Sequence, residues 1–205
     1  MSKPVSAIVL AAGQSRRMGR RNKLLSLVNG RPMIEQVVAE IARSTVDEII
    51  VVTGHEHKAV LACMQAWSAP RLRTVFNPLY REGMASSIVC GLVAMKAQVG
   101  GALVCLGDMP WLVAEDYNRI IAAFNVSTPG SICVPFTRGQ RGNPVLWGSA
   151  FFPQLKTLTG DKGARSLLAQ HPEAWVKVLF SSDHILLDVD TPQAFGAPAG
   201  QSPSG

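Results

Sequence analysis

The sequence has little cysteine and no long apolar run, and both absences limit what the protein can be. Its cysteines stand singly in apolar surroundings and form no Cys-x-x-Cys pair, which argues against a zinc site and favours core thiols. No stretch approaches the roughly 20 apolar residues of a transmembrane helix. Because no secretory leader is recognisable either, we expect a cytoplasmic protein that does not enter a membrane. The cysteines are Cys63, Cys90, Cys105 and Cys133.

Aromatic residues are also scarce, at 6% of the chain, although the formal net charge is +6. A basic protein can bind nucleic acid, but the arginines and lysines gather mainly in the loop after Leu10 and around Arg138 and Arg141. Few aromatic residues lie near these clusters to stack on bases. We therefore expect a small anionic substrate and no nucleic acid.

Strand-like and helix-like segments alternate, which is typical of a mostly parallel sheet covered by helices. We predict a three-layer α/β fold with helices on both faces of the sheet. Residues 1–195 are expected to form one domain, and the Gly-, Ala-, Ser- and Pro-rich residues 196–205 a disordered tail. The predicted strands are 5–10, 48–53, 71–76, 102–106, 131–135, 143–147 and 174–180. The predicted helices are 32–42, 55–67, 84–97, 114–124, 149–156 and 162–170.

A basic, glycine-containing loop follows the first predicted strand. It reads Leu-Ala-Ala-Gly-Gln-Ser-Arg-Arg-Met-Gly from Leu10 and reaches Lys-Leu-Leu at Lys23. Small residues let backbone N–H groups approach an anion, and the cations neutralise phosphate charge. The spacing fits neither a Walker loop nor a dinucleotide fingerprint, and we interpret the loop as a triphosphate cradle rather than a solvated connection. Its small and cationic residues are Ala11, Ala12, Gly13, Arg16, Arg17 and Lys23.

Two acidic motifs follow apolar stretches, at positions where open α/β sheets bind ligands. Asp108 lies in Gly-Asp-Met-Pro, and Asp190 lies in Asp-Val-Asp-Thr-Pro. Both carboxylates suit magnesium, which prefers carboxylate and substrate phosphate oxygens. Each residue has an alternative role, since Asp108 can shape a turn or cap the helix near Val113 and Asp190 can cap a short helix near Pro192.

Three polar, glycine-bearing motifs complete the candidate site. The segment from Asn77 to Ser87 can bind a base or ribose, although Asn-Pro is a common turn and Ser86 can cap a helix. The segments 138–147 and 160–165 are cationic and can bind a second anionic substrate. A solvated hairpin and an ordinary helix start are their alternatives.

Taken in order, these motifs resemble the molybdenum cofactor cytidylyltransferases of the MobA-type nucleotidyltransferase superfamily. The resemblance spans residues 10 to 192. It implies a Rossmann-like, GT-A-type nucleotidyltransferase fold, a Mg²⁺ cofactor, and transfer of CMP from CTP to the phosphate of molybdopterin with release of pyrophosphate. Expected partners are CTP, molybdopterin or the molybdenum cofactor, and a molybdenum hydroxylase or its maturation chaperone. The alternatives are a nucleotidyltransferase using GTP or a sugar or alcohol phosphate, and a non-catalytic molybdenum cofactor carrier.

The resemblance also implies residue roles. Ala12 favours CTP, because relatives that transfer GMP carry Leu-Ala-Gly-Gly here. Asn143 departs from the histidine of many relatives, and Arg21 and Asn22 occupy a variable loop position for which we expect little significance. The expected catalytic residues are Arg17, Lys23 and Asp108, and the magnesium ligands are Asp108 and Asp190. The expected nucleotide-binding residues are Leu10, Ala11, Ala12, Gly13, Asn77, Gly83, Ser86 and Ser87. The expected acceptor-binding residues are Arg141, Asn143, Pro144, Lys162 and Arg165. The histidines outside the motifs, expected to be structural or exposed, are His55, His57, His171 and His184.

Overall fold

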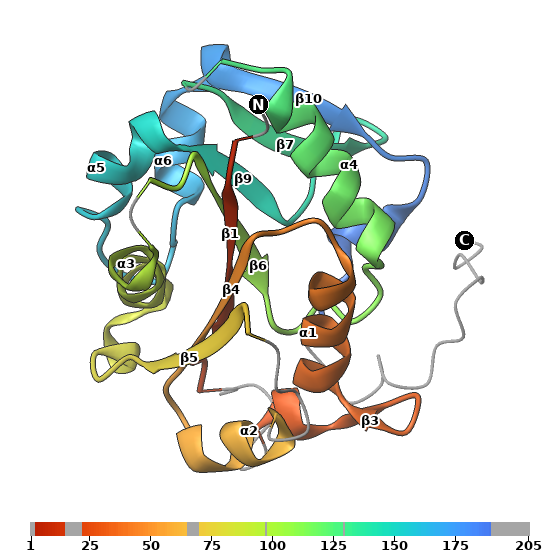
Figure 1. Cartoon of the computed structure of the whole chain (residues 1–205), viewed down its shortest axis with the longest axis vertical. Helices are drawn as coiled ribbons and strands as arrows, with labels where there is room; N and C mark the ends of the chain where they lie inside the picture. The colour runs from red at the N-terminus through yellow and green to blue at the C-terminus, as the bar shows by residue number, and fades with distance from the viewer. Residues whose placement is uncertain (1–2, 15–21, 65–69, 97, 129, 190–205) are drawn as a thin grey trace.

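A computed structural model describes residues 3–14, 22–64, 70–96, 98–128 and 130–189 (Figure 1). Its centre is an eight-stranded sheet of order β10-β7-β9-β6-β1-β4-β5, with β8 paired to β7. The strands are β1 (Val5–Ala11), β4 (Glu48–Thr53), β5 (Leu72–Phe76), β6 (Gly101–Leu106), β7 (Ile132–Thr137), β8 (Gln140–Arg141), β9 (Val145–Gly148) and β10 (Trp175–Leu179). A two-stranded hairpin, β2 (Leu27–Val28) and β3 (Arg31–Pro32), precedes the first helix.

The sheet is mostly parallel, as the sequence predicts. The strand β1 pairs in parallel with β4 on one side and β6 on the other, and β5 extends the sheet beyond β4. Within the described strands of this eight-stranded sheet, only β8 and β9 form antiparallel pairs with their neighbours. Along the chain, β4 and β5 are added on one side of β1 and β6 is then added on the other side, so the strand order reverses at β1. In α/β proteins, ligands bind outside the carboxyl ends of strands at such a point.

Helices cover both faces of the sheet, which confirms the three-layer prediction (Figure 1). On one face lie α1 (Met33–Arg43), α2 (His57–Met64) and α4 (Ala114–Asn125). On the other face lie α3 (Met84–Ala94), α5 (Phe152–Leu155) and α6 (Arg165–Gln170). Short 3-10 helices are η2 (Lys23–Leu25), η3 (Tyr80–Glu82), η4 (Ser149–Phe151), η5 (Pro172–Ala174) and η6 (Asp183–Leu186).

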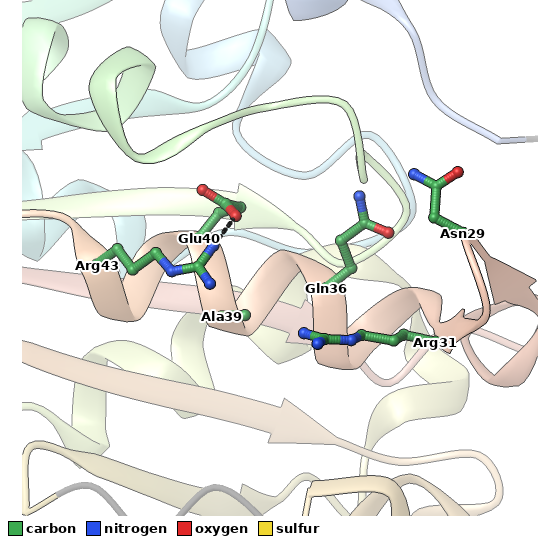
Figure 2. Close-up of a pocket in the computed structure, with 6 residues that line it drawn as sticks. All are labelled: Asn29, Arg31, Gln36, Ala39, Glu40 and Arg43. Atoms are coloured by element: carbon green, nitrogen blue, oxygen red, sulfur yellow. Dashed lines mark hydrogen bonds and ion pairs between the residues drawn. The ribbon is translucent and has the colours of Figure 1, made fainter. Parts of the chain in front are cut away.

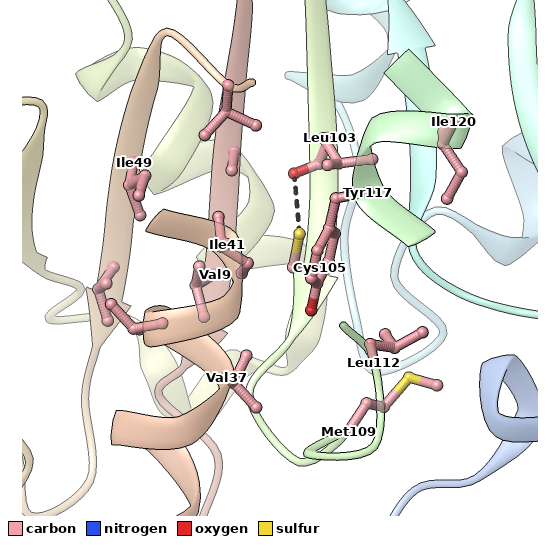
Figure 3. Close-up of a cluster of buried hydrophobic side chains, with 14 of the residues drawn as sticks. Val9, Val37, Ile41, Ile49, Leu103, Cys105, Met109, Leu112, Tyr117 and Ile120 are labelled. Atoms are coloured by element: carbon pink, nitrogen blue, oxygen red, sulfur yellow. Dashed lines mark hydrogen bonds between the residues drawn. The ribbon is translucent and has the colours of Figure 1, made fainter. Parts of the chain in front are cut away.

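Two apolar cores hold these layers together, because alternate side chains of a strand point to opposite faces. Val9 joins the core beneath α1 and α4, whereas Ile8 joins the core beneath α3. Figure 3 shows Val9 among Val37 and Ile41 of α1 and Tyr117 of α4. Each such side chain contributes about 1.5–3 kcal/mol when it is fully buried.

The cysteines only partly match the expectation of core thiols. Cys105 and Cys133 are buried, whereas Cys63 and Cys90 are partly exposed, and all four are free. Burial raises the pKa of Cys105 far above its ordinary value and that of Cys133 to about 11, so both thiols stay protonated at neutral pH. Among the described residues, no helix combines the length and the apolar character needed to span a membrane.

Several predicted elements begin later than the sequence suggested. Pro32 belongs to β3 and precedes α1, since its ψ of 136° is extended. The predicted strand 143–147 begins at Val145, because the Asn143 N–H donates to the Ile185 carbonyl and proline has no N–H. The predicted helix 162–170 begins at Arg165, after a glycine with positive φ. The helix predicted at 149–156 is a 3-10 turn followed by four helical residues.

Glu48 ties strands together at the edge of the sheet where β1 and β4 begin. Its carboxylate accepts hydrogen bonds from the Ser6 hydroxyl at 2.8 Å, the Lys96 N–H at 3.2 Å and the Arg73 guanidinium at 3.0 Å. Burial alone raises the Glu48 pKa, but these donors outweigh it and hold the pKa below its ordinary value of 4.5.

Replacing Glu48 by glutamine should lower the free energy of unfolding at pH 7 by about 1–3 kcal/mol, since charged hydrogen bonds are lost. A depressed folded-state pKa stabilises the protein above the unfolded value and loses that effect as pH falls through the folded value. The difference between Glu48→Gln and the parent should therefore shrink below pH 4.5. Urea denaturation at a series of pH values from 7 downward measures this difference in the free energy of unfolding. A difference that did not change with pH would contradict the lowered pKa of Glu48.

Candidate functional site

The candidate site lies at the carboxyl ends of β1, β4, β5 and β6, which share one edge of the sheet. The loops that leave these strands are joined by backbone hydrogen bonds. The His55 N–H, after β4, donates to the Ala12 carbonyl at 3.3 Å, and the Gly107 N–H, after β6, donates to the Leu10 carbonyl at 3.1 Å. Parallel pairing thus gathers segments that are far apart in the sequence around the start of the basic loop.

Gly13 is a small residue that the fold itself does not require. No atom of the described residues lies within 4 Å of a methyl group built on Gly13, and the residue does not have a positive φ. Ala11 and Ala12 before it are buried, whereas Gly13 is exposed. A glycine lets the backbone come close to an anion such as a phosphate.

Lys23 and Asp108 form an ion pair at this edge. The ammonium of Lys23, at the start of η2, lies 2.5 Å from Asp108 Oδ2, and each side chain is 17% exposed. The cation predicted to bind phosphate and the carboxylate predicted to bind a metal thus lie side by side. The alternative in which Asp108 caps α4 is not what the structure shows. The carboxylate at the N-terminus of α4 is that of Asp116, which accepts the Val113 N–H at 2.9 Å.

The second expected magnesium ligand cannot be placed in the same way. Asp190, Arg16 and Arg17 lie outside the described residues. The preceding residue, Val189, is buried, and its N–H donates to the Asp108 carbonyl at 3.0 Å. Within the described ranges, no group of three or more His, Cys, Asp or Glu side chains is arranged to hold a metal ion.

Asn77 follows β5 and is buried within a polar cluster. Its amide donates to the Ser86 and Ser87 hydroxyls at 2.9 and 3.0 Å, and its Oδ1 accepts the Leu79 N–H at 2.9 Å. Ser86 is inside α3 rather than at its cap, and its hydroxyl donates to the Gly83 carbonyl at 2.9 Å. The role of Asn77, Ser86 and Ser87 in nucleotide binding stays a prediction, and in this structure the Asn77 amide organises the turn before α3.

Gly83 brings the segment from Asn77 to Ser87 into contact with the segment 160–165. It has φ +108°, and a methyl group there would lie 2.6 Å from the Gly160 carbonyl oxygen and 2.5 Å from Asp161 Oδ1. The Ala85 N–H, in the first turn of α3, donates to the same Gly160 carbonyl at 3.1 Å. The loop that carries Lys162 therefore packs directly on the N-terminal end of α3.

The expected acceptor-binding residues are distributed over two segments. Lys162 and Arg165 are exposed on the loop beside α3 and at the start of α6. Arg141 lies over the Trp175 ring, 5.1 Å from its centroid, and the Trp175 indole donates to the Leu168 carbonyl in α6 at 3.0 Å. Asn143 and Pro144 are joined by a cis peptide bond and precede β9. Because β9 is antiparallel to β6, they lie at the same edge as Asp108.

Two features were missed from the sequence. Asn22 is buried, and its Oδ1 accepts the Leu24 N–H at 3.1 Å, although we expected little significance at this position. The signal was an asparagine directly before a turn, which is a preferred type of N-cap residue.

A pocket of about 320 Å³ also lies away from the predicted residues, on the outer side of α1 and the β2–β3 hairpin (Figure 2). It is lined by Asn29, Arg31, Gln36, Ala39, Glu40 and Arg43.

Comparison with solved structures defines the fold. The fold matches that of Rv0371c from Mycobacterium tuberculosis H37Rv with a TM-score of 0.82 and 25% identity, covering 95% of this chain and 97% of the other. It also matches a nucleotidyl transferase from Methanothermobacter thermautotroptrophicus with a TM-score of 0.80 and 23% identity, covering 94% of each chain. The fold is thus the Rossmann-like, GT-A-type fold of nucleotidyltransferases, as expected.

Sequence comparison then gives the family. A profile of the MobA-like NTP transferase domain matches residues 7–175. The nicotine blue oxidoreductase of Paenarthrobacter nicotinovorans is 30% identical over 194 residues, covering 91% of this chain and 92% of that protein. The purine catabolism protein PucB of Bacillus subtilis is 29% identical over 194 residues, covering 92% of each. The chain belongs to the MobA-like NTP transferase family and is an enzyme of the nucleotidyltransferase class.

Alanine substitutions at Gly83 and Gly13 are predicted to differ in their effect on the free energy of unfolding. Gly83→Ala should lower the free energy of unfolding by about 1–3 kcal/mol, because the new methyl group meets the Gly160 backbone at a strained φ. Gly13→Ala is the matched control and should leave stability within about 0.5 kcal/mol. Chemical denaturation of both variants measures these effects. Equal stability of Gly83→Ala and the parent would show that residues 160–161 do not pack as described.

Proposed function

We propose that this enzyme transfers CMP from CTP to the phosphate of molybdopterin and releases pyrophosphate. The observation that carries the proposal is the Lys23–Asp108 pair, held 2.5 Å apart at the carboxyl edge of the sheet. A nucleoside triphosphate and its metal ion need these two charges in this proximity. The order of motifs that resembles the molybdenum cofactor cytidylyltransferases supports this choice of nucleotide and acceptor.

In the proposed reaction, an oxygen of the acceptor phosphate attacks the α-phosphorus of CTP. A new P–O bond forms, the bond between the α-phosphorus and the bridging oxygen breaks, and pyrophosphate leaves with its electron pair. The reaction needs no protein nucleophile, so catalysis depends on positioning and charge stabilisation. Lys23 and Arg17 would neutralise the phosphates, while the backbone at Ala12 and Gly13 would bind them.

The metal of the proposal is Mg²⁺, with Asp108 and Asp190 as its ligands. Carboxylate oxygens are the donors that this hard cation prefers, and the Asp108 side chain is partly exposed at the edge of the sheet. When bound, the ion would offset the negative charge of the phosphate oxygens. A structure of Rv0371c, of the same fold at a TM-score of 0.77 and 23% identity, was solved in complex with manganese, which supports a divalent cation here.

The remaining residues of the proposal surround this centre. Asn77, Gly83, Ser86 and Ser87 would bind the base and ribose, directly or by shaping the turn before α3. The acceptor would meet the segments of Arg141 to Pro144 and Lys162 to Arg165. We place the reaction in the cytoplasm, with a molybdenum hydroxylase or its maturation chaperone as the recipient of the product.

The name of the Paenarthrobacter relative suggests redox chemistry, but the first loop of this chain lacks the dinucleotide fingerprint that would favour a nicotinamide cofactor.

The choice of nucleotide can be tested by thermal unfolding with CTP, GTP, UTP, ATP or NADPH, each with and without Mg²⁺. A ligand at about 100 times its dissociation constant adds about 2.7 kcal/mol of stability. We expect the largest shift with CTP and Mg²⁺, and a smaller one for Gly13→Ala, whose methyl group occupies the space above the loop. A preference for GTP would overturn the role assigned to Ala12. If only NADPH raised the unfolding temperature, the proposed CMP transfer would be overturned.

The metal-binding role of Asp108 gives a prediction for turnover. Asp108→Asn should lower the rate of pyrophosphate release from CTP and molybdopterin by at least about 100-fold, since the ligand charge is lost. The fold should persist, because the bond to the Val189 N–H comes from the Asp108 backbone. Circular dichroism checks the fold. Full metal-dependent activity in Asp108→Asn would refute this role. If the parent bound the molybdenum cofactor without releasing pyrophosphate, the alternative of a non-catalytic molybdenum cofactor carrier would be favoured.

A further inference from the structure

The position of Lys23 is fixed by the two residues beside it in the chain. Leu24 is buried in the core beneath α1 and lies against Gly107, since a methyl group on that glycine would be 3.4 Å from Leu24 Cδ2. This contact holds η2 beneath the segment that carries Asp108. On the other side of Lys23, the anchor is polar and consists of the Asn22 side chain, which is 3% exposed.

Asn22 makes two different hydrogen bonds from this buried position. Its Oδ1 accepts the Leu24 N–H at 3.1 Å and so caps η2, with the extended backbone of an N-cap at φ −71° and ψ 115°. Its Nδ2 donates to the His55 carbonyl at 3.5 Å. One bond thus fixes the turn that bears Lys23, and the other reaches the end of β4.

The His55 peptide extends this connection to the proposed phosphate loop. Its N–H donates to the Ala12 carbonyl at 3.3 Å, while its C=O accepts from Asn22. A chain of hydrogen bonds therefore runs from the residue before Gly13, through His55 and Asn22, to the turn of Lys23. The route does not pass through residues 15–21, which connect the same two points along the sequence.

We propose that Asn22 is a positioning residue, which sets the ammonium of Lys23 relative to the backbone of Ala12 and Gly13 so that both bind one triphosphate. This inference rests on the proposed function, in which Lys23 contacts the nucleotide. The position requires an acceptor for the cap and a donor for the His55 carbonyl, and asparagine provides both. Serine retains a capping acceptor on a shorter side chain, and aspartate retains the acceptor but places a charge against a carbonyl oxygen.

The test measures the dissociation constant of CTP with Mg²⁺ by calorimetry, or of whichever nucleotide the thermal panel selects. Asn22→Ser and Asn22→Asp should each weaken binding, by about 10-fold to 100-fold, because small displacements of a binding group have effects of this size. The matched control is Asn118→Ser. The Asn118 Oδ1 also accepts a backbone N–H, that of Thr45 at 2.8 Å, but in the loop before β4 at the opposite edge of the sheet. The control should bind the nucleotide like the parent.

A double-mutant cycle with Lys23→Met separates positioning from general loss of structure. If Asn22 acts through Lys23, then Asn22→Ser should weaken binding by less than about 2-fold once Lys23 is already replaced. Equal effects in both backgrounds would overturn the inference, and so would parent-like binding by Asn22→Ser. If Lys23→Met itself bound the nucleotide like the parent, the proposed role of Lys23 would fail instead, which distinguishes the two failures.

Discussion

The parallel pairing of β1 with both β4 and β6 determines where the chemical groups of this protein can meet. Parallel strands end at the same edge, so the residues that follow β1, β4 and β6 become neighbours although the sequence separates them widely. Hydrogen bonds from His55 to Ala12 and from Gly107 to Leu10 then fix the spacing of the three loops. This pairing brings Lys23, which follows β1, next to Asp108, which follows β6.

The Lys23–Asp108 pair also solves an electrostatic problem of the edge. Each side chain is largely screened from water, and an isolated charge in such a position is costly. Placing opposite charges together lowers that cost while leaving both groups where a phosphate and a divalent cation would need them. The arrangement resembles a site whose charges are balanced before its ligands arrive.

Sequence patterns were sufficient for the longer strands of the sheet, but they did not predict the short strands β2, β3 and β8 or the contacts between distant segments. The strand 48–53 was predicted with its observed ends, because an apolar run bounded by polar residues defines it. The later start of β9 was not predictable, since it depends on a bond between Asn143 and the distant Ile185. The same reason applies to Asn22, whose second partner, His55, lies in another loop. Local rules identify an N-cap, but they do not identify what the cap holds in place.

The two halves of the candidate site differ in how the fold constrains them. The proposed nucleotide half follows the ends of central strands, whereas the proposed acceptor half is carried by later loops, which tolerate change better than strands do. Gly83 links them, because its lack of a side chain lets the loop of Lys162 close on α3. Members of one family can therefore keep the same nucleotide chemistry while the loops change the acceptor. Positions such as Asn143, rather than Lys23 or Asp108, are where differences in acceptor should arise.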